Sequence, residues 1–194
     1  SGPFMHKLVA PLAEEMGEAY PELIEAGVTD LDQIHEVSKF RSGAGHNFSY
    51  MAHPDCEVEI PYFFANDASE PASSMKHYFN PISTVEWSEI EVYSPINGTI
   101  VGWSNESDKG TALTIESSAF PGVSVTVFHV SLALPPKIGD VVSAGDNLGT
   151  HYGSKSDSDI AVGIVTPDGY MLVSYFDVMT DDVFQDYEAH GASS

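Results

Sequence analysis

Positive charge and cysteine are scarce in this sequence of 194 residues. Seven Lys and Arg residues stand against 29 Asp and Glu residues, which gives a formal net charge of −22, and Arg41 is the only arginine. Because such a field repels phosphate groups, the composition argues against nucleic acid and anionic membrane surfaces as partners. The single cysteine, Cys56, excludes a disulfide within the chain and a cysteine-rich zinc site. No run approaches the roughly 18 apolar residues of a membrane-spanning helix, so we expect no integral membrane segment.

Apolar residues are plentiful enough for a folded domain. The chain is 42% hydrophobic and 11% aromatic, which is sufficient for a buried core. The acidic composition suits a salty or extracellular setting, and the start Ser1-Gly2-Pro3, without an initiator Met, fits the removal of an upstream segment. We therefore expect a secreted or periplasmic protein. The sequence leaves the oligomeric state open.

The pattern of apolar residues divides the chain into three parts. Residues 1–40 have apolar residues at helical spacing, and Thr29-Asp30 is typical of a cap for a helix over residues 30–38, so we predict a short helical N-terminal extension. Residues 41–180 form the predicted β domain, with strands from residue 89 onward and a long irregular insertion at 51–88 that contains four prolines. Residues 181–194 are predicted to be an acidic C-terminal tail whose last residues are mobile.

Two segments of the β half carry a recognisable signature. They read SPINGTIV at residues 94–101 and IGDVVSAGDNLG at residues 138–149. Gly139 and Gly145 stand where a tight turn needs a positive φ. The segments resemble the pattern P-x-x-G-x-V … V-G-D-x-V-x-x-G-x-x-L-G of barrel-sandwich hybrid domains. The resemblance implies a mainly β fold, an antiparallel barrel-sandwich hybrid.

Two families share this signature: the lysostaphin-type zinc endopeptidases, with a duplicated hybrid motif, and the biotinyl and lipoyl carrier domains. The peptidases fit better, because FHVSL at residues 128–132 and RSGAGHNFS at residues 41–49 stand where they carry a-H-L-S and H-x-G-x-D-F. A carrier domain needs a modifiable lysine on an exposed hairpin. Only Lys155 is near the required place, without a neighbouring Met, so the carrier domain is a second alternative.

The resemblance to the peptidases also implies where zinc ligands would stand, and this chain departs from the pattern there. Gly43 and Asn47 occupy the positions of the first His and the Asp, and Ala161 occupies the last position of the late His-x-His, where Asp159 replaces the first histidine. Only His129 matches a catalytic group, the family histidine that helps to polarise the reaction centre. The resemblance therefore implies a metallopeptidase-like domain that lacks the usual zinc ligands, needs no cofactor and binds a peptide or cell-wall-like polymer in a polar groove.

The alternative is an active hydrolase with a rearranged site. His129 and His46 are then the catalytic candidates, and zinc would bind only at a site assembled from His46, His77, His129 and Asp159. The candidate substrate-binding residues are Arg41, Asn47, His77, His151 and Asp159. Arg41 has the guanidinium geometry to clamp a substrate carboxylate, although internal carboxylates or carbonyls are its commoner partners.

Three further features have simpler interpretations. Compact ligand spacing occurs in one loop, at His53, Asp55, Cys56 and Glu57. Ser42 near His46 suggests a nucleophile and a base, but no third group that would orient them is identifiable. In the aromatic and basic run at residues 76–79, we expect Tyr78 and Phe79 to pack beneath the long loop.

Overall fold

The computed structural model describes residues 20–40, 74–153, 156–166 and 169–192. Within these ranges, ten strands follow one another along the chain: β1 (Ile34–Val37), β2 (His77–Pro81), β3 (Glu91–Tyr93), β4 (Gly98–Asn105), β5 (Thr111–Ser117), β6 (Val123–Leu132), β7 (Val141–Val142), β8 (Asn147–His151), β9 (Ser158–Thr166) and β10 (Gly169–Val173). Short 3-10 helices are η1 (Leu31–Gln33), η3 (Trp87–Glu89), η4 (Ser107–Lys109) and η5 (Phe176–Val178). The α-helix of the described residues is α2 (Asp181–Ala189).

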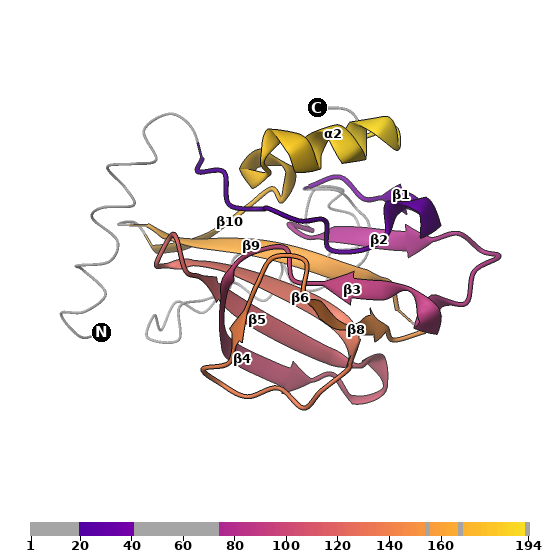
Figure 1. The fold of residues 1–194 in the computed structure, drawn as a ribbon, viewed down its shortest axis with the longest axis horizontal. Helices are drawn as coiled ribbons and strands as arrows, with labels where there is room; N and C mark the ends of the chain where they lie inside the picture. The colour runs from indigo at the N-terminus through magenta and orange to yellow at the C-terminus, as the bar shows by residue number, and fades with distance from the viewer. Residues whose placement is uncertain (1–19, 41–73, 154–155, 167–168, 193–194) are drawn as a thin grey trace, which may run out of the picture.

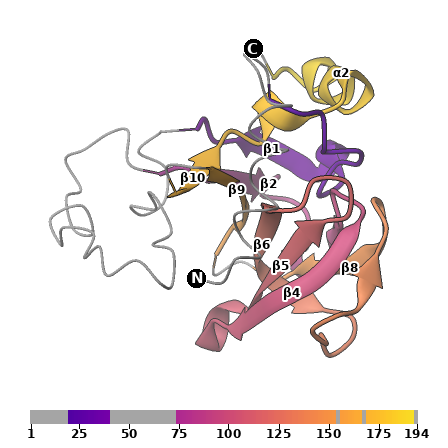
Figure 2. The same cartoon turned by 90° about the vertical axis from the view of Figure 1, so that its left-hand side faces the viewer.

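The strands form one antiparallel sheet in the order β1-β2-β9-β6-β5-β4-β7, with β10 beside β9, and β8 joining β3 to β6. The predicted mainly β, antiparallel class is confirmed. The sheet is open rather than closed into a barrel, because its path ends at β1 and at β7. Figures 1 and 2 show that the sheet bends, so that β4 and α2 lie at opposite ends of the molecule.

Alternating apolar residues of β5, β6 and β9 build the main core, since successive side chains of a strand point to opposite faces. Its central members are buried almost completely: Ile115, Val125, Val127, Ile160, Val162 and Ile164. The helix α2 covers one end of this core with Val183 and Tyr187. Gly98 of the sequence signature has a packing role, because a Cβ there would lie 2.3 Å from the carbonyl oxygen of Glu116 on β5.

The predicted helix over residues 30–38 is wrong. Asp30 does cap a turn, with its Oδ1 accepting from the N–H of Asp32 at 3.1 Å, but that turn is the short η1. The chain then continues as β1, where Val37 pairs with Phe79 of β2. Pairing with a distant strand satisfies the backbone in place of helical bonds. Residues 20–40 contain no α-helix, and residues 1–19 of the predicted helical extension lie outside the described residues.

Two other boundaries need correction. The predicted irregular insertion at 51–88 contains β2, which is held between β1 and β9, and the start of η3. Residues 51–73 lie outside the described ranges. The predicted acidic tail begins with α2, whose Val183 and Tyr187, four residues apart, face the core. No helix among the described residues has the length and apolar character needed to cross a membrane.

Candidate functional site

His129 stands at the point where β6 changes its partner strand. Phe128 is the last β6 residue paired with β9, opposite Asp159, whereas Val130 is already paired with His151 of β8. The backbone of His129 has φ 58°, which is uncommon for a residue other than glycine. Its carbonyl oxygen accepts from the N–H of Tyr152 at 3.1 Å. A side chain held in this way is directed by the sheet itself rather than by a loose loop.

The imidazole of His129 lies between two carboxylates. Its Nδ1 is 3.0 Å from Glu106 Oε2, and its Nε2 is 3.4 Å from Asp159 Oδ2. Glu106 also accepts from the backbone N–H of His129 at 3.1 Å. Burial favours the neutral ring, but contact with Asp159 and the charge of Glu106 outweigh burial and raise the pKa of His129. The arrangement therefore favours the imidazolium form.

Lys76 is the second cation of the site and the more deeply buried one. Its Nζ lies 3.1 Å from Asp159 Oδ1, and the side chains of Lys76 and Asp159 are 2% and 0% exposed. The ammonium also lies 3.5 Å from the ring centroid of Phe128, within the range of a cation–π contact. Burial lowers the pKa of Lys76, and the charge of Asp159 opposes this effect. This pair could not be predicted from local sequence, because the pairing of β2 with β9 brings Lys76 and Asp159 together.

Ala161 lies two residues beyond Asp159 and therefore on the same face of β9. Its methyl group is buried in a small apolar cluster with Met75, Ala112, Phe128 and Leu172. Ala161 offers no atom that could bind a metal, and the carboxylate of Asp159 already faces the ammonium of Lys76. Across the described ranges, no three His, Cys, Asp or Glu side chains are grouped so as to hold a metal ion. The described residues of this face therefore do not fit zinc.

His77 does not join this site. It pairs with Ile160, whereas Tyr78 pairs with Asp159, so His77 points to the opposite face of the sheet from Asp159. Its Nδ1 donates to the carbonyl oxygen of Ser38 at 2.8 Å, and its Nε2 accepts from the N–H of Tyr175 at 3.3 Å. Burial lowers the pKa of His77 to about 4. His77 is thus a neutral, hydrogen-bonded histidine of the interior.

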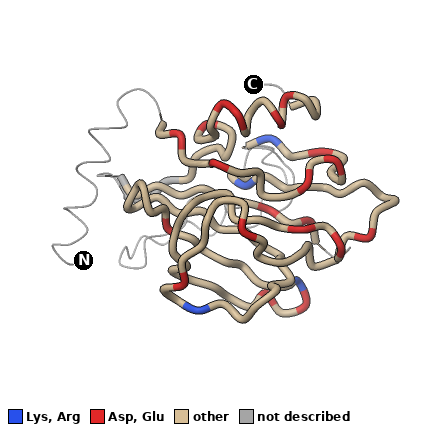
Figure 3. Tube along the Cα trace, viewed as in Figure 1, with Lys and Arg blue, Asp and Glu red and all other residues tan. Residues whose placement is uncertain are grey.

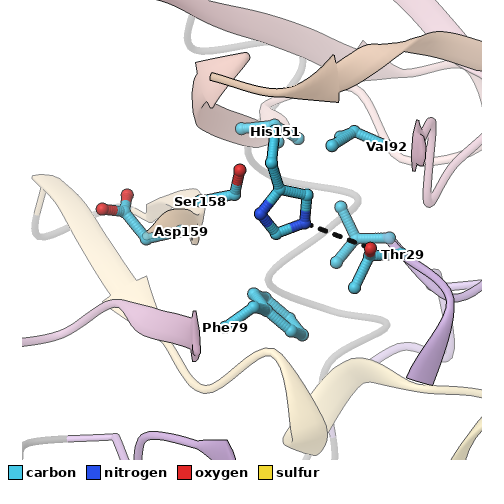
Figure 4. A pocket seen from close by; sticks show the side chains of 8 residues that line it. Thr29, Phe79, Val92, His151, Ser158 and Asp159 are labelled. Atoms are coloured by element: carbon cyan, nitrogen blue, oxygen red, sulfur yellow. Dashed lines mark hydrogen bonds between the residues drawn. The ribbon is translucent and has the colours of Figure 1, made fainter. Parts of the chain in front are cut away.

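His151 is also buried, but on the core side of β8. Thr29 donates its hydroxyl hydrogen to the carbonyl oxygen of Glu91 at 2.9 Å, so the contact of 3.2 Å between Thr29 Oγ1 and His151 Nε2 has the histidine as donor. The Nδ1 of His151 has no hydrogen-bond partner among the described residues. Figure 4 shows the ring in a small pocket beside Ser158, with the carboxylate of Asp159 directed away from it. Burial lowers the pKa of His151 to about 4.

The described structure thus unites only two of the predicted site residues, His129 and Asp159. The other predicted residues that would complete the site lie outside the described residues: Arg41, Ser42, Gly43, His46, Asn47, His53, Asp55, Cys56, Glu57 and Lys155. Sequence reasoning missed Lys76 and Glu106. In a strand, residues two positions apart point to the same face, which would have placed Lys76 on the same face as Tyr78. Glu106 lies in a turn, and nothing in the sequence around it indicates a contact with His129.

Comparisons with known proteins bear on the fold. No family model matches the sequence. No curated protein matches it either. Among solved structures, a protein described as the glycyl-glycine endopeptidase LytM from Ruminococcus gnavus ATCC 29149 is similar with a TM-score of 0.50 and 13% identity, over 81% of this chain and 60% of that one.

Two further structures are similar at lower scores. A chain of the SpoIIQ–SpoIIIAH pore-forming complex has a TM-score of 0.48 and 16% identity, over 89% of this chain and 99% of that one. A zinc-containing peptidase from Vibrio cholerae has a TM-score of 0.43 and 12% identity, over 80% of this chain and 41% of that one. At such identities a likeness shows the fold alone. The likeness to the Ruminococcus gnavus endopeptidase therefore shows a peptidase-like fold for the described residues.

Proposed function

We propose that this chain is a metallopeptidase-like domain that binds a peptide or a cell-wall-like polymer without zinc-dependent hydrolysis. The peptidase-like fold supports the first half of the proposal. The ion pair between Lys76 and Asp159 supports the second, since it places a protein cation on the face where the family resemblance expects a metal. A polymer of this kind is found outside the cytoplasm, so the proposal includes a secreted or periplasmic location.

The buried ammonium of Lys76 makes this face a poor metal site for an electrostatic reason. Two unit charges 4 Å apart interact by about 4 kcal/mol at an effective dielectric constant of 20, and a divalent ion doubles that figure. A zinc ion beside Asp159 would therefore be repelled by Lys76 or would have to displace it. Ala161 supplies no ligand in compensation.

The state of His129 supports the same conclusion. A general base must offer a free ring nitrogen to take a proton. Here both ring nitrogens face carboxylates, of Glu106 and Asp159, and the raised pKa favours the form in which both nitrogens carry hydrogen. His129 is therefore suited to holding the site together or to donating a proton, and poorly suited to removing one.

The test combines binding with turnover. Purified protein is incubated with insoluble bacterial peptidoglycan, and both the fraction that sediments with it and the release of soluble fragments are measured with added zinc and with a chelator. We expect sedimentation without release of fragments, and no stoichiometric zinc by elemental analysis. Stoichiometric zinc together with release that a chelator abolishes would refute the proposal.

An active hydrolase with a rearranged site is the second candidate, and the contact of His129 with two carboxylates is the observation in its favour. In that case His129 would donate a proton to a leaving group. Soluble glycine-containing peptides are the probe, and mass spectrometry detects their cleavage. Cleavage by the unmodified protein that is lost in His129→Ala would support this candidate, whereas cleavage that persists in the variant would exclude it.

A further inference from the structure

A groove of about 390 Å³ lies beside the site, between the tip of the β4–β5 hairpin, the end of β6 and the segment that follows it. This volume is within the range of small-molecule binding sites in proteins. The groove adjoins His129, since the backbone N–H of its lining residue Tyr152 donates to the carbonyl oxygen of His129. Its lining includes Asn105, Ser107, Gly110, Thr111, Leu134 and Tyr152.

None of these lining residues carries a charge, although acidic residues are frequent in the rest of the described chain (Figure 3). The polar lining consists of hydroxyl groups and one amide, which can both donate and accept hydrogen bonds. Charged residues next to lining residues in sequence include Glu106, which is turned towards His129, and Asp108 and Lys109, which do not line the groove. The groove is therefore a neutral, polar surface on a protein with a formal net charge of −22.

The aromatic ring of Tyr152 forms a fixed wall of this groove. Gly110 lies against it, because a Cβ at Gly110 would be 2.8 Å from Tyr152 Cδ2. Gly110 also has φ 88°, a conformation that other residues rarely adopt. Tyr152 is 36% exposed, so part of the ring remains open to a ligand, and Leu134, which also lines the groove, is 78% exposed.

We infer that this groove binds an uncharged oligosaccharide. A sugar ring presents apolar C–H faces, which pack on an aromatic ring, and hydroxyl groups, which match Asn, Ser and Thr side chains. A polyanion is disfavoured by the net charge, and the lining holds no charged group to pair with the termini or ionised side chains of a peptide. The inference rests on the proposed function, since it names the glycan strand as the part of the cell-wall-like polymer that is recognised here.

The experiment uses a soluble hexamer of β-1,4-linked N-acetylglucosamine, titrated into the whole chain and followed by calorimetry and by amide chemical shifts. We expect saturable binding, with shifts concentrated in residues 105–111, 131–134 and 152. Tyr152→Ala removes the stacking surface and should weaken binding by about tenfold, whereas Tyr152→Phe keeps the ring and should change it by no more than about threefold. The matched control is Trp103→Ala, which removes an aromatic ring that is 50% exposed on β4 but does not line the groove.

The outcomes separate this inference from the proposed function. Sedimentation with peptidoglycan but no binding of the hexamer overturns the inference and leaves the proposed function intact. Absence of both kinds of binding overturns both. The inference is also overturned if Tyr152→Ala leaves binding of the hexamer unchanged. The same holds if an anionic galacturonate oligosaccharide, or a soluble peptide that competes for the same residues, binds as well as the hexamer.

Discussion

Replacing Lys76 by Met removes the buried ammonium while keeping an unbranched apolar chain of similar length. The variant leaves the carboxylate of Asp159, whose side chain is 0% exposed, without the cation 3.1 Å from it. At that distance and an effective dielectric constant of 20, the Coulomb attraction is about 5 kcal/mol. Breaking a buried pair by removing one partner typically costs about 3–5 kcal/mol, so we expect a loss of that order in the free energy of unfolding.

Urea unfolding followed by tryptophan fluorescence measures this loss. With a slope of about 2 kcal/mol per molar urea, a loss of 4 kcal/mol lowers the midpoint by about 2 M. Lys137→Met is the matched control, because Lys137 is exposed and its replacement should change the free energy of unfolding by less than about 0.5 kcal/mol. The measurement therefore separates the loss of a buried charge from the loss of a lysine in general.

A double variant tests whether Asp159 is the reason for the loss. Lys76→Met with Asp159→Asn leaves no uncompensated charge in this pair, so it should be more stable than Lys76→Met alone, with a coupling energy of about 2 kcal/mol or more. This variant remains informative even if Lys76→Met alone does not fold. If the loss of stability in the double variant equalled the sum of the losses in Lys76→Met and Asp159→Asn, the two residues would not be coupled. That result would refute the view that Lys76 takes the place of a metal as the counter-charge of Asp159.

Three further predictions concern the rest of the fold. Because burial lowers the pKa of His77 and of His151 to about 4, each histidine binds a proton more readily when the chain is unfolded. Their stabilising effect is complete above about pH 6.5 and is lost as the pH falls towards 4. In His77→Gln or His151→Gln the free energy of unfolding, measured with urea, should therefore fall less across that window, by up to about 3 kcal/mol for each variant. Tyr187→Ala should cost about 3–5 kcal/mol in thermal or urea unfolding, because its ring is 2% exposed against the core, whereas a mobile tail would tolerate the change. Gly98→Ala should prevent or strongly weaken folding, because its Cβ would meet the backbone of β5. A Cβ at Gly102, on the same strand, would have its nearest neighbour at 3.8 Å, so Gly102→Ala should change the urea midpoint little. Equal effects of the two substitutions would contradict the packing role of Gly98.

The β half was predictable because its signal is local. Strands from residue 89 onward alternate in polarity, and Gly139 and Gly145 have the positive φ that their turns require, with values of 94° and 86°. The N-terminal part was not predictable in the same way, since β1 exists only through pairing with residues about forty positions away. Helical spacing of a few apolar residues is a weak signal when a distant strand can satisfy the same backbone groups.

The candidate site was predictable only where the resemblance supplied a motif. His129 and Asp159 were identified from the family pattern, and the pairing of β6 with β9 brings them within 3.4 Å. Lys76 was recognised only as part of the aromatic and basic run at residues 76–79. Its contact with Asp159 was not predicted, because the surrounding segment was interpreted as irregular and the alternation that places its side chain was not applied. Glu106 lies in the turn of the β4–β5 hairpin and contacts His129 on β6. The two residues are far apart in sequence, so no spacing of residues predicts this contact.

The position of His129 shows how the sheet holds this histidine in place. A residue with φ 58° is strained, and such strain persists only where the surroundings fix it. Here the backbone N–H of His129 donates to Glu106 and its carbonyl accepts from Tyr152, while its ring lies beside the same glutamate and Asp159. His129 therefore contacts three segments, two through its ring and one through its backbone carbonyl, and its raised pKa favours a positive charge between the two carboxylates. These contacts give the histidine a structural role that needs no metal and that keeps the wall of the neighbouring groove in place through Tyr152.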